Sequence, residues 1–256
     1  MSHNVITVET PVKNVPHNKS MTDPVPPLSI PDHADAVGAQ LLLSGRDFLA
    51  SKGDRGQWRW EGRDICFVDL PRPALTGSFQ IRNAAGVLAV LEALGPRLPV
   101  APAAICSGLQ RVHLPGRFQE ISRAPRVILD VAHNLQAVVA LFANLSAAGV
   151  GGSVRAVFGC MKDKAVEEIL RIGAPVVDAW YCCDLNSPRA MGARRLAGLL
   201  GSIGGKQGMR ADVSIHASPQ DAFRAAASAA GDIDTVLVFG SFLTVGGVLQ
   251  AHGGIN

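Results

Sequence analysis

The stretch Val127-Ile128-Leu129-Asp130-Val131-Ala132-His133-Asn134 passes from a short apolar run directly into polar residues. Continuous apolar runs of this length are typical of strands that are buried on both faces of a sheet. Three similar runs follow, at residues 154–158, 176–181 and 235–239. Patterns with helical spacing separate them, at about 135–149, 164–172, 192–200, 219–230 and 241–251. This alternation predicts an α/β fold with a Rossmann-like, mostly parallel sheet.

In such a sheet the ligand site lies beyond the carboxyl ends of the strands. The turns at these ends are therefore the places to search for chemistry: 130–134, 159–164, 183–189 and 240–244. Asp130 and His133 suit an anionic or amino-acid ligand, Lys162 could touch a phosphate or carboxylate, and Ser241 offers a hydroxyl. From the residues alone, ordinary helix capping, as by Asn134, is the preferred explanation of the 130–134 turn, and a solvated turn or a cap explains those at Lys162 and Ser241.

The first half of the chain is less regular. A hairpin around Glu61-Gly62 and two helices, at 80–94 and 103–109, are expected in residues 34–113, without a complete sheet of their own. Residues 1–33 are expected to form a disordered leader, because six of the sixteen prolines lie in the first 31 positions. The leader lacks the charged and apolar regions of a signal peptide.

Composition excludes several classes of function. The 256 residues are 48% hydrophobic and carry a net charge of only +3, so we expect neither a nucleic-acid nor a membrane partner. Five cysteines without C-x-x-C spacing indicate a reducing compartment and no zinc site. The sequence contains no G-x-x-x-x-G-K-[ST] motif, since Gly205-Lys206 is followed by Gln207. A P-loop is therefore absent from this sequence.

Several short motifs carry a resemblance to a known family. They are Gly45-Arg46-Asp47-Phe48, Gln80-Ile81-Arg82-Asn83-Ala84-Ala85, Leu114-Pro115-Gly116-Arg117-Phe118-Gln119, the 127–134 stretch, Met161-Lys162-Asp163-Lys164, Trp180-Tyr181, Pro188-Arg189 and Gly240-Ser241-Phe242-Leu243-Thr244-Val245. In order and spacing they resemble the bacterial bifunctional dihydrofolate synthase/folylpolyglutamate synthases of the Mur ligase superfamily. The resemblance covers essentially everything after the leader.

This resemblance implies an ATP-dependent ligase that joins the amine of L-glutamate to a carboxylate of dihydropteroate or of a folate. The carboxylate is first phosphorylated, because phosphorylation turns its oxygen into a good leaving group, and the amine then attacks the acyl phosphate. ATP and Mg²⁺ are the implied cofactors. A cytoplasmic monomer is expected.

The resemblance also assigns residues. Asn83 would lie beside the adenine, Arg117 would reach the nucleotide phosphates, and Asp130 would bind the ribose. His133 and Ser241 would lie beside the incoming glutamate, with Lys162 and Asp163 near the reacting centre. The catalytic residues are thus expected to be His133, Lys162 and Asp163. Leu243 stands where the family often has histidine.

The departures from the family shape the expected domain organisation. Because the P-loop and the Mg²⁺-binding residues have no counterpart, residues 34–113 are expected to be the C-terminal remnant of the ATP-binding central domain. Residues 114–256 are expected to be a complete Mur ligase C-terminal domain. Such a partial chain should be inactive alone. Two alternatives remain open: a non-catalytic module that binds a ligand or complements a separately encoded P-loop half, and a fragment of a cell-wall Mur ligase.

Overall fold

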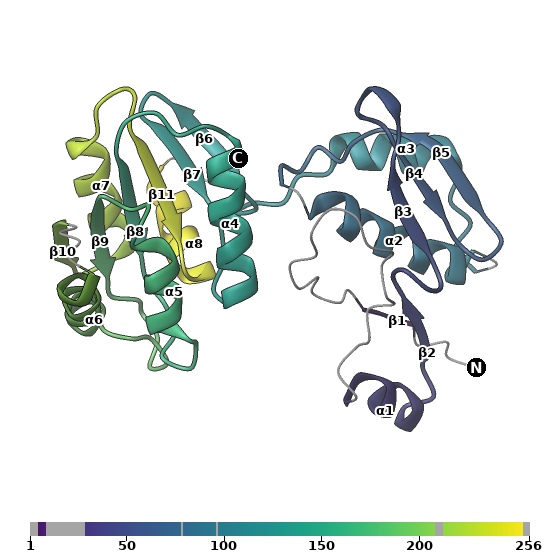
Figure 1. Ribbon diagram of the computed structural model, residues 1–256, viewed down its shortest axis with the longest axis horizontal. Coiled ribbons are helices and arrows are strands. Elements are labelled where there is room, and N and C mark those ends of the chain that lie inside the picture. Colours follow the sequence, from purple (N-terminus) through teal and green to yellow (C-terminus); the bar gives the residue numbers. More distant parts are fainter. Residues whose placement is uncertain (1–4, 9–28, 78, 96, 208–211, 253–256) are drawn as a thin grey trace. The chain divides into compact units, whose positions relative to one another are not determined.

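The structure is a computed structural model that describes residues 5–8, 29–77, 79–95, 97–207 and 212–252 (Figure 1). The chain divides into two compact units, Met1–His113 and Leu114–Asn256, and each is considered by itself. Among the described residues, no helix combines the length and the apolar character needed to cross a bilayer.

In its described residues, the N-terminal unit combines two small sheets with three α-helices. Its elements are β1 (Val5–Val8), α1 (Ser29–Ala36), β2 (Gln40–Leu43), β3 (Leu49–Lys52), a 3₁₀ turn η1 (Asp54–Gly56), β4 (Trp58–Glu61), β5 (Cys66–Leu70), α2 (Gln80–Leu94) and α3 (Pro102–Arg111). Strands β3, β4 and β5 form an antiparallel sheet, and β1 pairs with β2 in parallel. Trp58 and Trp60 are fully buried in the core of the N-terminal unit. The indole N–H of Trp60 donates to the carbonyl of Ala85 in α2 at 3.0 Å. The expected hairpin and both expected helices are present.

The expectation of a disordered leader through residue 33 is wrong for two segments. The β-branched residues of β1 suit a strand, and its backbone pairs with β2 from Val5↔Gln40 to Val8↔Leu43. Helix α1 begins at Ser29, and Pro31 fits its first turn because no intrahelical bond needs that N–H. The rest of the leader, residues 1–4 and 9–28, lies outside the described residues.

The C-terminal unit is a six-stranded sheet covered by helices on both faces (Figure 1). Its elements are β6 (Gln119–Arg123), β7 (Arg126–Leu129), α4 (Leu135–Ala147), β8 (Val154–Phe158), α5 (Val166–Gly173), β9 (Ala179–Cys183), α6 (Ala193–Gln207), β10 (Asp212–His216), α7 (Pro219–Ala229), β11 (Thr235–Phe239) and α8 (Phe242–Ala251). The strand order is β10-β9-β8-β11-β7-β6, and only β6 runs antiparallel to its neighbour.

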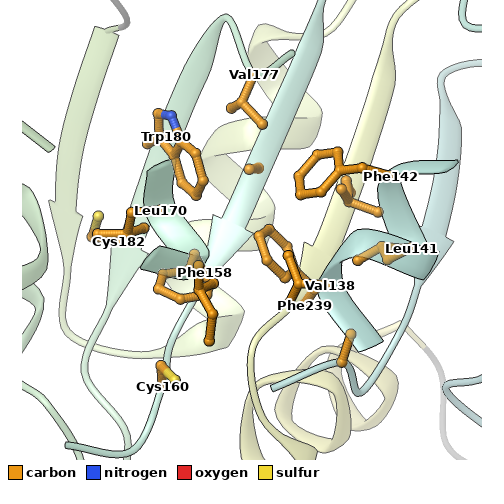
Figure 2. Packing of buried hydrophobic residues seen from close by; sticks show 14 of the residues in the cluster. Val138, Leu141, Phe142, Phe158, Cys160, Leu170, Val177, Trp180, Cys182 and Phe239 are labelled. Atoms are coloured by element: carbon orange, nitrogen blue, oxygen red, sulfur yellow. The ribbon is translucent and has the colours of Figure 1, made fainter. Parts of the chain in front are cut away.

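Alternate side chains of the central strands fill two separate cores. Ile128, Phe158, Trp180 and Phe239 point to the face covered by α4, α5 and α6, whereas their neighbours point to α7 and α8. Figure 2 shows the aromatic cluster on the first face, where the rings of Phe158 and Phe239 lie 4.9 Å apart and those of Phe158 and Trp180 lie 5.8 Å apart. Burial on both faces explains why these strands appear in the sequence as continuous apolar runs.

The strand order brings three of the predicted turns together. Strand β11 lies between β7 and β8, so the turns that follow these strands are neighbours at one edge of the sheet. The turn after β9 lies beside the turn after β8. We call the edge of the sheet formed by the turns after β7, β8, β9 and β11 the carboxyl edge. Because β6 is antiparallel and Gln119 pairs with Leu129, the segment that precedes β6 also ends there.

Candidate active site

Asp130 is the best-anchored polar side chain of the carboxyl edge. Its Oδ2 accepts a hydrogen bond from the backbone N–H of Phe118 at 2.9 Å, and its Oδ1 accepts one from Ala132 at 2.8 Å. Burial raises the pKa of Asp130 above its ordinary value, and the two N–H bonds and the charge of Arg117 offset this only in part. Each carboxylate oxygen can accept a further hydrogen bond, so the anchored group can still bind a ligand hydroxyl.

The anchoring of Asp130 also shapes the segment that carries Arg117. Gly116 and Phe118 both have positive φ angles, of 72° and 46°. A Cβ on Gly116 would lie 2.8 Å from a methyl group of Val131, so only glycine fits there. The buried neighbours leave Arg117 exposed between them. A cation is thus presented to solvent beside the Asp130 carboxylate.

His133 lies at the start of the turn that leads into α4. Its Nδ1 lies 2.8 Å from the carbonyl oxygen of Val131, so this nitrogen carries a hydrogen. In the neutral ring, Nε2 is then the acceptor. The ring packs beside that of Phe242 at the start of α8, with 6.0 Å between ring centroids. The next residue, Asn134, caps α4 through Ala137 N–H, as expected from ordinary capping.

The turn after β11 is fastened to both of its neighbours. Gly240 N–H donates to the carbonyl of Ala132 at 3.0 Å, and the buried Thr244 hydroxyl donates to the carbonyl of Gly159 at 2.8 Å. Between these contacts, the Ser241 hydroxyl accepts from Leu243 N–H at 3.1 Å and caps α8. Ser241 is therefore held in a fixed position on the same edge as His133.

Lys162 and Asp163 follow β8 and contact the turn after β9. Lys162 Nζ donates to the carbonyl of Pro188 at 2.9 Å. Asp163 Oδ2 accepts from Arg189 at 3.2 Å and lies 3.1 Å from Lys164 Nζ. The hydrogen bond with Lys164, with a smaller contribution from Arg189, holds the pKa of Asp163 below its ordinary value. Both residues predicted near the reacting centre thus already have partners within the protein.

Most of the predicted site residues lie at one edge of the C-terminal unit, and one belongs to the N-terminal unit. Arg117, Asp130, His133, Ser241 and the Lys162-Asp163 turn lie on the carboxyl edge. Asn83 lies in α2 of the N-terminal unit, where its exposed amide donates to Gln80. Its predicted role beside the adenine stays a prediction.

Sequence reasoning missed three residues that shape this edge. They are Phe118, whose N–H holds Asp130; Thr244, which joins the turns after β8 and β11; and Arg189, which binds Asp163. Their motifs were visible in the sequence, but the pairing of each residue depends on loops that meet only in the fold.

The described residues do not suit a metal ion by themselves. No group of three or more histidine, cysteine or acidic side chains among them could hold one. The implied Mg²⁺ therefore has no ligand set in the described part of the chain. No catalytic step of this chain is assigned to a metal.

Comparison with known proteins identifies the fold around the carboxyl edge. Residues 116–242 match the family described as the Mur ligase glutamate ligase domain. This part of the chain is a Mur ligase C-terminal domain. The matched segment begins at Gly116 and ends at Phe242, so it includes the predicted site residues of the carboxyl edge.

The similarity extends beyond the Mur ligase C-terminal domain into the N-terminal unit. The dihydrofolate synthase/folylpolyglutamate synthase of Escherichia coli is 38% identical over 228 residues, which are 89% of this chain and 50% of that protein. The same-named protein of Haemophilus influenzae is 28% identical over 87% of this chain and 53% of its own length. The chain thus spans about half the length of the curated relatives that it matches.

Solved structures agree with this assignment. Escherichia coli FolC in complex with DHPP and ADP aligns with a TM-score of 0.74 and 37% identity, over 88% of this chain and 50% of that one. A bifunctional folylpolyglutamate synthase/dihydrofolate synthase with Mn, AMPPNP and L-glutamate bound gives a TM-score of 0.72 at 37% identity. The alignment covers 88% of this chain and 51% of that one. Relatives of the Mur ligase C-terminal domain are thus C–N-forming ligases that have been crystallised with nucleotide and with glutamate.

Proposed function

We propose that this chain forms the glutamate-ligating part of an ATP-dependent ligase that adds L-glutamate to dihydropteroate, to folates, or to both, through an acyl phosphate. The observation that carries the proposal is the anchored carboxylate of Asp130, with the exposed cation Arg117 near it, on the same edge as His133 and Ser241. The names of the relatives support the choice of substrates. The protein is proposed to act as a cytoplasmic monomer.

The side chains of the carboxyl edge suit the parts of this reaction. Arg117 provides an exposed cation for nucleotide phosphates, and Asp130 provides acceptors for ribose hydroxyls. ATP, when bound, supplies the phosphoryl group that activates the substrate carboxylate. With its Nδ1–H held by Val131, His133 offers Nε2 as the acceptor of a proton from the glutamate ammonium, which frees the amine for attack. Ser241 adds a hydroxyl near the glutamate.

The N-terminal unit is proposed to be the C-terminal part of the ATP-binding central domain, with Asn83 beside the adenine. The β- and γ-phosphates need the backbone cradle of a P-loop, which this sequence does not contain. We therefore propose that a segment with a P-loop, in the same polypeptide or separately encoded, completes the enzyme. The Mg²⁺ ion would be held by that segment and by the phosphates.

A ligation assay tests this proposal in two steps. The purified 256-residue chain, given ATP, Mg²⁺, L-glutamate and dihydropteroate, should form no dihydrofolate. A chimera should form dihydrofolate if it fuses this chain to the half of the Escherichia coli protein that this chain does not match. One ADP should be released for each glutamate added. Turnover by the chain alone would contradict the need for a P-loop. An inactive chimera that still folds and binds ATP would contradict the proposed ligase function.

A further inference from the structure

We propose that two copies of this chain associate through strand β10, with their β10 strands side by side and antiparallel, so that the two six-stranded sheets become continuous. The inference goes beyond the proposed function and does not depend on it. Strand β10 (Asp212–His216) is the last strand on one side of the sheet, and its only neighbour among the described strands is β9. We call the side of β10 that faces away from β9 its free side.

The backbone of β10 has hydrogen-bonding groups on its free side. Asp212 N–H donates to the carbonyl of Asp178 at 3.2 Å, so the backbone groups of Asp212 are directed toward β9. This direction alternates along a parallel strand, and the N–H and C=O groups of Val213 and Ile215 therefore point to the free side. No other strand in the described part of the chain pairs with them. Unpaired groups of this kind are a template for a further strand.

The side chains of β10 also leave apolar surface uncovered. Val213 is 37% exposed and Ile215 is 47% exposed. Both project to the same face of the sheet, because side chains alternate along a strand. Many proteins protect an edge strand with lysine, proline or a β-bulge, and β10 contains none of these. The free side of β10 is therefore suited to pairing.

The sequence of β10 is complementary to itself when two copies run antiparallel. With Ser214 of both copies at the two-fold axis, Val213 of one copy lies opposite Ile215 of the other, and each such pair exchanges both of its N–H···O bonds. In the same register Asp212 faces His216 of the second copy, so an acid meets a base and no like charges are opposed. This match of backbone groups, apolar side chains and charge identifies the occupant of the free side as a second copy of the chain.

The size of the contact determines how strong the association is. A contact limited to two five-residue strands buries less than the roughly 1,200 Å² at which stable interfaces begin. We therefore expect a dissociation constant of about 0.1–1 mM. Catalysis by a monomer is compatible with this affinity, because such a dimer separates at the low protein concentrations of an enzyme assay.

Sedimentation velocity tests the association on the whole chain. Between about 10 µM and about 1 mM protein, the average sedimentation coefficient should rise from that of a monomer toward that of a dimer and no further, because a two-fold contact closes. Ile215→Lys places a charge in the contact and should weaken association by about tenfold or more. Ile233→Lys is the matched control, since Ile233 is 74% exposed and lies outside β10, and it should associate like the wild type. Circular dichroism checks that both variants fold.

A disulfide tests the register of the two strands. The background carries Cys66→Ser and Cys106→Ser, because the other three cysteines are buried. Ser214→Cys should form a covalent dimer on oxidation, since residues directly opposite one another lie about 4.5–5.5 Å apart, which suits a disulfide. Asp212→Cys is the matched control: in this register its counterpart in the second copy lies about 13 Å away, beyond the reach of a disulfide.

The outcomes of the two experiments decide the proposal. It is overturned if the sedimentation coefficient does not depend on concentration, if it rises beyond that of a dimer, or if Ile215→Lys has no more effect than Ile233→Lys. It is also overturned if oxidation cross-links Ser214→Cys no more than Asp212→Cys. Because neither experiment uses a substrate or a nucleotide, the result is independent of the ligation assay.

Discussion

The backbone N–H of Phe118 donates to Oδ2 of Asp130 at 2.9 Å, which fastens the residue before β6 to the residue after β7. Phe118 is held at a φ angle of 46°, which non-glycine residues rarely adopt. This strained backbone adjoins Arg117, whose charge partly offsets the burial that raises the pKa of Asp130. Strain of this kind persists where surrounding contacts enforce it, and it often occurs at functional sites.

Removing the Asp130 carboxylate should destabilise the C-terminal unit. In Asp130→Ala, the N–H groups of Phe118 and Ala132 lose their acceptors. Because unsatisfied N–H groups are costly, we expect the free energy of unfolding to fall by about 2 kcal/mol. Urea unfolding monitored by circular dichroism measures the loss. Asp232→Ala removes an exposed acid and should change stability little. Equal effects of the two substitutions would mean that Asp130 does not anchor the edge.

Gly240 should not tolerate a side chain. Its φ angle is 107°, and a Cβ would lie 2.6 Å from the carbonyl oxygen of Gly159. We expect Gly240→Ala to cost more than about 2 kcal/mol in the free energy of unfolding. Gly198 in α6 is the matched control, because a Cβ there meets no heavy atom within 4 Å, and Gly198→Ala should stabilise by about 0.5–1 kcal/mol. Equal destabilisation by Gly240→Ala and Gly198→Ala would contradict this account of Gly240.

Asp234 should make stability depend on acid pH. Its carboxylate accepts from Ser153 N–H at 2.9 Å, Gly231 N–H at 3.1 Å and Arg155 at 3.2 Å, and these contacts, that of Ser153 first, lower its pKa. Because its pKa is lower in the folded state, ionised Asp234 stabilises the fold when the pH is above its unfolded-state pKa of about 4. This stability is lost as the pH falls through its folded-state pKa.

Asp234→Asn should therefore lower the urea midpoint at pH 7 and approach the wild type below about pH 4. The same pair of measurements on Asp232→Asn, an exposed neighbour, should show no such convergence. A difference between wild type and Asp234→Asn that stays constant from pH 7 to pH 3 would exclude ionisation of Asp234 as its cause.

The central strands could be predicted from the sequence because both of their faces are buried. Strands β8 and β11 have the same bounds as the apolar runs at 154–158 and 235–239. The edge strands β6 and β10 could not be predicted in this way, because partial exposure permits polar sequences such as Gln-Glu-Ile-Ser-Arg. Strand β9 begins three residues later than expected, since Val176 and Val177 belong to the preceding turn, where Val177 is buried in the core that α4, α5 and α6 cover.

The site was predictable where its residues follow a recognisable strand. Asp130, His133 and Ser241 were located in this way, because parallel strands end at the same edge. The contact between Arg189 and Asp163 could not be found, since 26 residues separate them and two irregular turns must meet first. The positive φ of Phe118 likewise depends on Asp130, twelve residues later.

Ligation by the chimera with Arg117→Ala tests the central claim most directly. Arg117 is exposed, so its removal should leave the unfolding transition unchanged. Arg123→Ala, which removes a cation whose side chain is 94% exposed, is the control and should remain fully active. If the carboxyl edge binds nucleotide phosphates as proposed, Arg117→Ala should lower the rate of glutamate addition at least tenfold, which corresponds to about 1.4 kcal/mol. Glutamate addition at the unmodified rate by a folded Arg117→Ala chimera would contradict that role.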